Sequence, residues 1–523
     1  MHNQEILSKR IFKGTSIIIF FSLLTSPLGY VLRILYSNSL SIEMYGLFYS
    51  LLAFFGILTT YKDLGFGYSV TYLIPKFIKQ KDFQKSWLVF KYNQFIEVGT
   101  SILLSLILIA SAPWLSINYF KVPEAQNLIY IFCIYFIANS FLEALYKMFT
   151  GLQQEKIYSS IQFSRLFLAL IFSLLFLVFD YANILYFTLA WALSHIICTV
   201  VYTYSLSQNM DFKKKTLSWD RKLFTTMLQY AIPTLITTSI YTFITFTDNF
   251  FLTLFKNVRE VGIYNIILPL ISIPSIFLSP INNLLFPLVS HLMEGEQTKT
   301  RYILNASLQL IPFVGSYFSL FIILFPSFTV QIIFGAKWVG LVETPLRIMA
   351  FGSILALLSS FLTTIASGMG KVRERMQISV IIAIFNVILS IILIRLYGIT
   401  GAAVASTAVY LLSIILFAKT VKKELIFNFP FKLYGIIIIF SLFLYIFIEF
   451  TGFAPHNFIQ FIITGIIYSF IVFVFGLALG IFDYFITIIT ETNNFIAIGN
   501  QYPKILNTLV RINSFLKQFS LKK

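Results

Sequence analysis

Charged side chains are scarce in this chain. Asp, Glu, Lys and Arg make up 11% of its 523 residues, whereas about a quarter of a soluble globular protein is charged. Hydrophobic residues make up 58% of the chain, and its mean hydropathy is +0.85. This composition excludes a soluble globular fold and indicates that a lipid bilayer is the main solvent of the chain.

Cysteine and histidine are also rare, and common enzyme motifs are missing. Cys133 and Cys198 lie inside apolar runs, which favours residues of the membrane core over a disulfide or a metal site. The four histidines, at positions 2, 195, 291 and 456, are too scattered to bind a metal. The sequence contains no G-x-x-x-x-G-K-[ST] phosphate-binding loop, no Ser-His-Asp triad and no carboxylate pair. We therefore expect no cofactor, no metal and no catalytic residue, and a transporter rather than an enzyme.

Long apolar runs, by contrast, are abundant. About 14 of them reach the roughly 20 residues that a helix needs to cross the hydrocarbon core of a bilayer. The second and eighth runs are overlong and contain glycine or proline, so we expect kinks in them. The predicted spans are residues 14–36, 45–74, 87–111, 128–149, 158–179, 184–206, 223–250, 260–286, 303–325, 341–366, 377–396, 399–418, 432–450 and 457–482.

The short loops between these runs carry most of the positive charge. When the loops are assigned alternately to two sides, one side holds roughly 28 Lys and Arg and the other roughly 5. The net charge of +17 therefore reflects membrane topology and does not indicate a nucleic-acid partner. Because basic loops face the cytoplasm, both termini are predicted to be cytoplasmic.

No loop is long enough to fold as a separate domain. This weighs against a membrane polymerase, which usually needs a sizeable extramembrane loop with acidic or metal-binding residues. In the tail, apolar residues recur at helical spacing and basic residues fill the other face, which predicts an amphipathic helix on the inner membrane surface. A frayed basic tail is the alternative. The apolar positions are Ile505, Leu506, Leu509, Ile512, Leu516 and Phe519.

Two pairs of short segments recur at one spacing. The segments Glu43-Met-Tyr-Gly-Leu-Phe48 and Glu260-Val-Gly-Ile-Tyr264 begin with glutamates that are 217 residues apart. Gly151 and Gly368, which follow the fourth and tenth spans, are also 217 residues apart. Six spans separate equivalent points, so both halves have one orientation, and this predicts a parallel repeat about an axis along the membrane normal.

The predicted fold class is an all-α integral membrane protein. We expect two parallel six-helix lobes, residues 1–210 and 211–420, followed by two extra transmembrane helices in residues 421–485 and the cytoplasmic amphipathic tail, residues 486–523. In two-lobed transporters the substrate path runs between the lobes. We therefore expect a path that opens alternately to each side.

Several short segments, in this order and spacing, resemble one family. The chain is similar to the polysaccharide-biosynthesis flippases of the multidrug/oligosaccharidyl-lipid/polysaccharide (MOP) exporter superfamily over spans 1–12. Where that family often has proline before the last segment, this chain has Arg395, at the predicted outer end of a span. The segments are Glu43-Met-Tyr-Gly-Leu-Phe48, Asp63-Leu-Gly65, Ala231-Ile-Pro233, Thr247-Asp248, Glu260-Val-Gly-Ile-Tyr264, Ile333-Phe-Gly335 and Tyr397-Gly-Ile-Thr-Gly-Ala-Ala403.

The resemblance implies a flippase that uses no ATP. Its substrate would be an oligosaccharide on a polyprenyl phosphate or pyrophosphate, moved from the cytoplasmic to the outer leaflet of the cell membrane. The expected partners are this glycan, the bilayer and other membrane proteins of glycan assembly. A cation-coupled multidrug and toxin extruder on the same fold is the main alternative, and a membrane polysaccharide polymerase is the less favoured one.

Charged residues inside predicted spans are the candidate functional residues, because each costs about 2.5–3.5 kcal/mol to insert. As substrate-binding candidates we take Arg33, Lys62, Asp63, Arg165 and Asp248, and as coupling-ion candidates Asp63, Glu97 and Glu143. The spans also contain Arg347 and Glu449.

Each candidate has a structural alternative. Arg165, helped by Lys62 or Lys147, suits an anionic phosphate because its planar fork bonds two oxygens, but it equally fits a buried pair with Glu97. Glu143 and Lys147 are spaced i, i+4 and fit a pair on one helix surface.

Arg33 and Asp248 occupy near-equivalent places in the two lobes, toward the outer ends of their spans. They fit an outer gate, in which the two opposite charges close against each other. They also fit the headgroup boundary, where a charge costs little.

Overall fold

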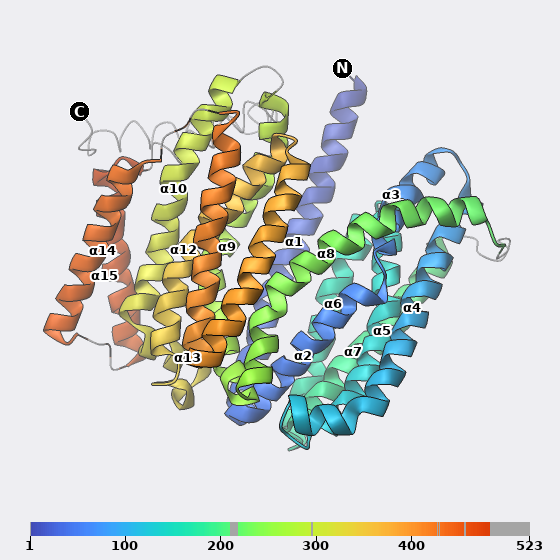
Figure 1. Cartoon of the computed structure of the whole chain (residues 1–523), viewed down its shortest axis with the longest axis horizontal. Helices are drawn as coiled ribbons and strands as arrows, with labels where there is room; N and C mark the ends of the chain where they lie inside the picture. Colours follow the sequence, from blue (N-terminus) through green and yellow to red (C-terminus); the bar gives the residue numbers. More distant parts are fainter. Residues whose placement is uncertain are drawn as a thin grey trace. The chain divides into compact units, whose positions relative to one another are not determined.

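The computed structural model describes residues 2–209, 218–293, 297–425, 427, 429–453, 455 and 457–481. These residues form α-helices and no strand, which confirms the predicted all-α membrane fold (Figure 1). The tail, residues 486–523, lies outside the described residues. The helices are α1 (His2–Ser39), α2 (Ile42–Lys62), α3 (Phe66–Lys79), α4 (Phe83–Trp114), α5 (Ala125–Gly151), α6 (Glu155–Val178), α7 (Ile184–Asn209), α8 (Arg221–Phe255), α9 (Val258–Leu292), α10 (Gln297–Leu324), α11 (Pro326–Phe334), α12 (Glu343–Gly368), α13 (Val372–Lys422), α14 (Phe431–Thr451) and α15 (Phe458–Ala478).

Twelve stretches of the described helices are long and apolar enough to cross a membrane. One of them, within α13, covers the two predicted spans 377–396 and 399–418, which meet at Gly398, where φ is 59°. The left-handed conformation of this glycine divides α13 into two crossings. Helix α8, predicted as a span at 223–250, has 35 residues, a length of about 52 Å.

The predicted span 45–74 is wrong as one element, because it forms two helices. Helix α2 ends at Lys62 and α3 begins at Phe66. Between them Leu64 and Gly65 have positive φ values of 48° and 80°, a left-handed conformation that ends a helix. The Asp63 carboxylate accepts a hydrogen bond from the Gly65 N–H at 2.8 Å and stabilises this turn. The kink expected here is thus a complete break.

The chain divides into two compact units, residues 1–262 and 263–523. In the first unit α5 packs against α4 and α7, α1 packs against α6, and α8 lies along α2 and α3 (Figure 1). Its core gathers apolar side chains from α3, α4, α5, α7 and α8, such as Val70, Val89, Met148 and Met227. The predicted lobe boundaries stay a prediction, since these units describe packing alone.

In the second unit α12 packs against α10, α11 and α13. The predicted extra helices, α14 and α15, both contact α10. Phe440 of α14 stacks on Phe475 of α15 with ring centroids 3.8 Å apart, and Tyr468 of α15 donates a hydrogen bond to the Tyr317 carbonyl of α10 at 2.6 Å.

The glycines of two repeated segments meet inside the first unit. A Cβ on Gly46 of α2 would overlap the Val258 carbonyl oxygen, and one on Gly262 of α9 would lie 2.6 Å from the Ile42 carbonyl oxygen. Both positions therefore need glycine for the two helix N-termini to touch. Arg259 adds an exposed ion pair to Glu43, with Nε 3.6 Å from Oε1.

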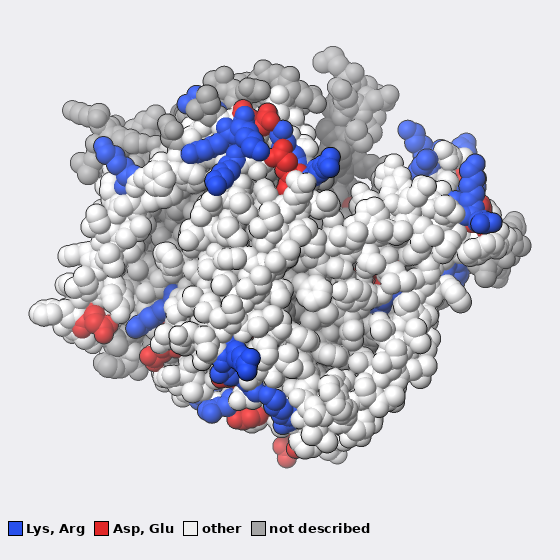
Figure 2. All heavy atoms as spheres, viewed as in Figure 1, with Lys and Arg blue, Asp and Glu red and all other residues white. Residues whose placement is uncertain are grey.

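The surface follows the pattern of a membrane protein. In Figure 2 the sides of the helix bundles are mostly uncharged, and Lys, Arg, Asp and Glu gather near the helix ends. Many large apolar side chains are exposed on the helix sides, among them Ile439, Phe450 and Ile459 of α14 and α15. Exposed apolar surface of this extent is expected where lipid tails, and not water, contact the protein.

Candidate functional site

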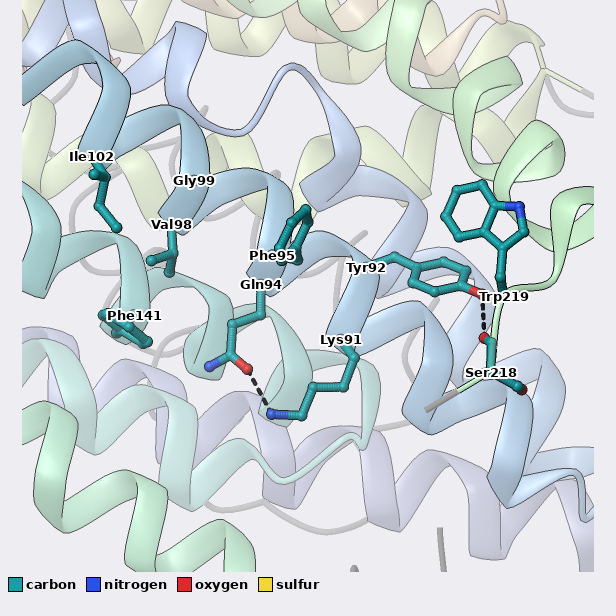
Figure 3. Close-up of a pocket in the computed structure, with 10 residues that line it drawn as sticks. All are labelled: Lys91, Tyr92, Gln94, Phe95, Val98, Gly99, Ile102, Phe141, Ser218 and Trp219. Atoms are coloured by element: carbon teal, nitrogen blue, oxygen red, sulfur yellow. Dashed lines mark hydrogen bonds between the residues drawn. The ribbon is translucent and has the colours of Figure 1, made fainter. Parts of the chain in front are cut away.

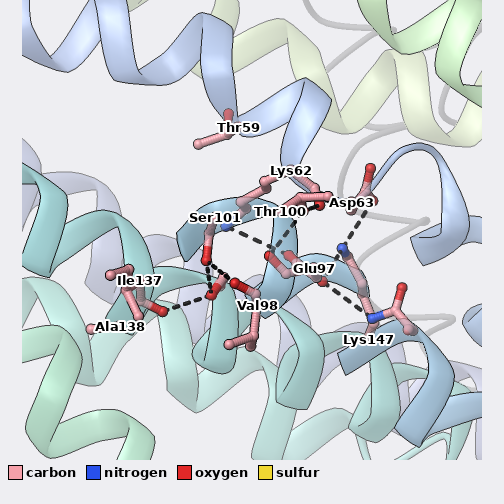
Figure 4. Close-up of polar contacts among 12 residues, drawn as sticks. Thr59, Lys62, Asp63, Glu97, Val98, Thr100, Ser101, Ile137, Ala138 and Lys147 are labelled. Carbon is pink, nitrogen blue, oxygen red and sulfur yellow. Dashed lines mark hydrogen bonds and ion pairs between the residues drawn. The ribbon is translucent and has the colours of Figure 1, made fainter. Parts of the chain in front are cut away.

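Four charged residues meet inside the first unit where α2 ends against α4 and α5 (Figure 4). The ammonium of Lys147 lies 2.9 Å from Oε2 of Glu97 and 3.0 Å from Oδ2 of Asp63. The ammonium of Lys62 lies 3.5 Å from Oε1 of Glu97. We call these four residues the charge cluster. Its two ammonium and two carboxylate groups sum to zero charge.

Most of this cluster is shielded from solvent, so each charge depends on its partners in the protein. The Glu97 side chain is 0% exposed, Lys62 3% and Lys147 15%. Glu97 also accepts a hydrogen bond from Asn93 at 3.1 Å. Removing one partner of such a pair leaves a buried charge uncompensated, which costs about 3–5 kcal/mol. Among the described residues the Lys62 ammonium has no hydrogen-bond acceptor, so its charge is balanced by Glu97 at a longer distance.

Glycine makes room for the cluster. A Cβ on Gly67 of α3 would lie 2.6 Å from Cε of Lys147 and 2.7 Å from Oδ2 of Asp63. The turn that breaks the predicted span therefore has two consequences. It places the Asp63 carboxylate next to the Lys147 ammonium, and it places Gly67 in contact with this ion pair. The sequence candidates included Lys62, Asp63 and Glu97 but gave Lys147 only a supporting part, and Gly67 was missed.

The two alternative pairings expected from the sequence are wrong. Lys147 is bonded to Asp63 and Glu97 and not to Glu143, and Glu97 is paired with lysines and not with Arg165. Within the described part of the chain, Glu143 of α5 and Arg165 of α6 make no ion pair and no hydrogen bond. Nε of Arg165 is buried without an acceptor.

Arg33 and Asp248 both belong to the first unit. The Arg33 guanidinium of α1 lies 4.7 Å from the ring centroid of Tyr49 of α2, in a cation–π arrangement. Asp248 is a buried residue of α8, and its neighbours in the sequence, Thr247 and Asn249, are also buried. The outer gate between Arg33 and Asp248 stays a prediction.

A polar pocket in the second unit was not anticipated. Its volume is about 420 Å³, and it is lined by Asn282, Phe286, Ser360, Thr363, Thr364, Ser367 and Arg375 from α9, α12 and α13. The hydroxyls of Thr363, Thr364 and Ser367 donate to carbonyls of their own helix, so their lone pairs remain available as acceptors. We call this the hydroxyl pocket.

A sequence signal for the hydroxyl pocket exists. The hydroxyl residues recur at positions 360, 363, 364 and 367, a spacing of i, i+3, i+4 and i+7 that places them on one helix face. Arg375 follows at the start of the next helix, and no acidic residue in the described ranges pairs with it. The contribution of Asn282, whose amide donates to Ser360 at 3.3 Å, could not be read from spacing.

Comparison with known proteins gives a sequence relative and several structural neighbours. An uncharacterized membrane protein of Methanocaldococcus jannaschii, MJ1068, is 25% identical over 484 residues, which are 89% of this chain and 95% of that protein. The fold is similar to that of the lipid II flippase MurJ in an inward closed conformation, with a TM-score of 0.66 and 17% identity over 87% of this chain and 98% of that one. An inward-facing multidrug resistance MATE family transporter of the MOP superfamily gives a TM-score of 0.61 and 13% identity, over 76% and 95% of the two chains.

These comparisons confirm the resemblance read from the short segments. This chain has the same fold as its structural neighbours, which are a membrane flippase and a membrane transporter. Residues 11–293, more than half of the 523 residues, match the family described as polysaccharide biosynthesis protein. The chain belongs to this polysaccharide biosynthesis family.

Proposed function

We propose that this protein moves a lipid-linked oligosaccharide from the cytoplasmic to the outer leaflet of the cell membrane by alternating access, with both termini in the cytoplasm. The substrate class is a sugar chain on a polyprenyl phosphate or pyrophosphate. The observation that carries the proposal is the hydroxyl pocket, which combines hydroxyl and amide groups with one arginine that has no acidic partner among the described residues.

The chemistry of this pocket suits a glycan phosphate. Sugar hydroxyls are donors as well as acceptors, and the lone pairs on Thr363, Thr364 and Ser367 can accept from them. The guanidinium of Arg375 can bond two phosphate oxygens at once. A cationic drug would be repelled by the guanidinium of Arg375, and the lining residues include no carboxylate to attract it.

The pairing of acidic residues in the first unit also argues against a cationic substrate. The carboxylates of Asp63 and Glu97 are neutralised by Lys147 and Lys62, which leaves the charge cluster without net negative charge for a cation. In our proposal Arg165 and Lys62 contact the phosphate, and Arg33 and Asp248 line the path near its outer end. Asp63, Glu97 and Glu143 remain the candidates for coupling to an ion, and of the three only Glu143 makes no ion pair in the described part of the chain.

One observation favours the rival function, a cation-coupled multidrug extruder. Glu143 is a carboxylate inside a transmembrane helix with no ion pair among the described residues, and such a group can bind a proton or a cationic ligand. The sign of the preferred substrate separates the two functions.

The test uses the purified full-length protein in lipid vesicles. A polyprenyl-pyrophosphate-linked oligosaccharide is placed in one leaflet, and its appearance in the other is followed with a sugar-binding or sugar-cleaving probe that cannot enter. We expect protein-dependent movement without ATP, and no uptake of lipophilic cationic dyes under an imposed proton or sodium gradient. Dye transport without movement of the glycan lipid would overturn the proposal in favour of the extruder.

A further inference from the structure

A groove of about 670 Å³ runs along α4 in the first unit (Figure 3). Lys91, Tyr92 and Trp219 lie at one end, and Ile102 lies at the other. The groove is separate from the charge cluster and the hydroxyl pocket, and none of its lining residues belongs to either.

The polar end carries a positive charge that has no ion-pair partner in the described ranges. The Lys91 ammonium donates one hydrogen bond to Oε1 of Gln94 at 2.9 Å and lies 4.6 Å from the ring centroid of Trp87. No described acidic residue forms an ion pair with it. An ammonium has three donors, so two remain for a ligand, and the charge favours an anion.

An exposed tryptophan is fixed at the same end of the groove. The Tyr92 hydroxyl donates to the Ser218 carbonyl and accepts from the Asp220 N–H, both at 2.7 Å, and its ring lies 5.4 Å from that of Trp219. These contacts hold Trp219 at the mouth of the groove although its side chain is largely exposed. Tryptophan and lysine together are typical of the interface between headgroups and hydrocarbon.

The other end is apolar and open. Phe95 is 81% exposed, Ile102 is also exposed, and a Cβ on Gly99 would meet no atom within 4 Å. Eleven residues separate Lys91 from Ile102, a rise of about 17 Å. One leaflet contributes about half of the roughly 30 Å hydrocarbon core, so the groove has the length of one leaflet.

The position of α4 fits this depth. Its 32 residues make a helix of about 48 Å, longer than the hydrocarbon core, so its first two turns can lie among the headgroups and place Lys91 at the boundary. The loop before α4 carries Lys81 and Lys85 and belongs to the predicted cytoplasmic side. Anionic lipids are concentrated in that leaflet and attract basic residues.

We propose that this groove is a binding site for an anionic phospholipid of the inner leaflet. The phosphate lies against the ammonium of Lys91, Trp219 lies at headgroup depth at the same end of the groove, and one acyl chain follows α4 past Phe95 and Gly99 to Ile102. The charge of Lys91 selects an anionic headgroup over a zwitterionic one, and the open face of α4 supplies the apolar contact. This site is independent of the transported substrate.

The test is photolabelling of the full-length protein in vesicles with diazirine-bearing phospholipids. Phosphatidylglycerol and phosphatidylcholine with the same acyl chains are compared, and labelled peptides are mapped. We expect phosphatidylglycerol to label residues 95–102 preferentially. Lys91→Gln should weaken this labelling about fivefold, the factor that corresponds to about 1 kcal/mol per basic residue near anionic lipid, and leave phosphatidylcholine labelling unchanged.

Gly99→Leu tests the apolar end, because a Cβ at this position meets no atom within 4 Å and a larger side chain there would occupy the groove. It should reduce labelling by both lipids. The matched controls are Lys156→Gln, an exposed lysine outside the groove, and Gly435→Leu, a glycine of α14 with equally open surroundings. Equal labelling of residues 95–102 by both lipids, or labelling unchanged in Lys91→Gln, would overturn the proposal. Competition by polyprenyl phosphate but not by phosphatidylglycerol would also overturn it, since the groove would then hold the substrate lipid.

Discussion

The ammonium of Lys147 lies 2.9 Å from a carboxylate oxygen of Glu97, although 50 residues separate them in the chain. This contact joins α4 to α5 inside the membrane-spanning part of the first unit, and the bond from Lys147 to Asp63 adds the end of α2. One partly buried lysine thus connects three helices.

Lys147→Met is expected to destabilise the protein. It leaves the fully buried Glu97 without its main counter-charge, and breaking a buried pair from one side costs about 3–5 kcal/mol. The midpoint of thermal unfolding of the purified protein in detergent measures this. Combining Lys147→Met with Glu97→Gln should restore part of the loss, because the uncompensated charge is then gone. Lys156→Met, at an exposed position, is the control, and an equal loss in both single variants would show that the cluster does not stabilise the fold.

Gly46→Ala is expected to loosen the contact between α2 and α9. The new methyl group would overlap the Val258 carbonyl oxygen, and overpacking typically costs about 1–3 kcal/mol. Gly29→Ala in α1 is the matched variant, because a Cβ there meets no atom within 4 Å. Alanine favours a helix over glycine by up to about 1 kcal/mol, so the control should be neutral or stabilising. The midpoint of thermal unfolding distinguishes Gly46→Ala from Gly29→Ala. Equal stability of the two variants would contradict the close contact between α2 and α9.

Arg165→Ala is expected to slow movement of a lipid-linked oligosaccharide about tenfold or more, since a hydrogen bond to a charged group contributes about 1.5–3 kcal/mol. Because Arg165 makes no ion pair in the described residues, its loss should leave thermal unfolding nearly unchanged. Arg165→Lys keeps the charge but not the planar guanidinium, so its transport rate should lie between those of the wild-type protein and Arg165→Ala. Normal transport by a well-folded Arg165→Ala would remove this residue from the substrate site.

Glu143→Gln tests ion coupling apart from substrate binding. If Glu143 takes up the coupling proton, the variant should transport at a rate that no longer responds to an imposed pH gradient, with binding of the glycan lipid retained. The comparison is wild-type protein in the same vesicles with and without the gradient. An unchanged response to the gradient in Glu143→Gln would assign coupling to another residue.

The sequence predicted the helical membrane fold because apolar runs of about 20 residues are a direct signature of a bilayer span. It failed at residues 62–66, where apolar runs on both sides were joined into one span across a turn in which Leu64 and Gly65 adopt left-handed conformations. A window of average hydropathy cannot register such a turn.

The sequence predicted most of the charged residues of the candidate site but not which of them form ion pairs. Helical spacing assigned Lys147 to Glu143, whereas its partners Asp63 and Glu97 lie 84 and 50 residues away. Contacts of this kind depend on how the helices pack, and one sequence carries no local signal for them. The groove along α4 was missed for the same reason, since Trp219 joins Lys91 only through the packing of Tyr92.

The most direct test of the central claim is the rate at which a polyprenyl-pyrophosphate-linked oligosaccharide changes leaflet in vesicles that contain the purified protein. The account predicts rapid, ATP-independent movement that falls about tenfold in Arg375→Gln, which removes the only arginine lining the hydroxyl pocket in the described residues. Rates equal to those of protein-free vesicles, with the protein shown to be folded, would contradict it.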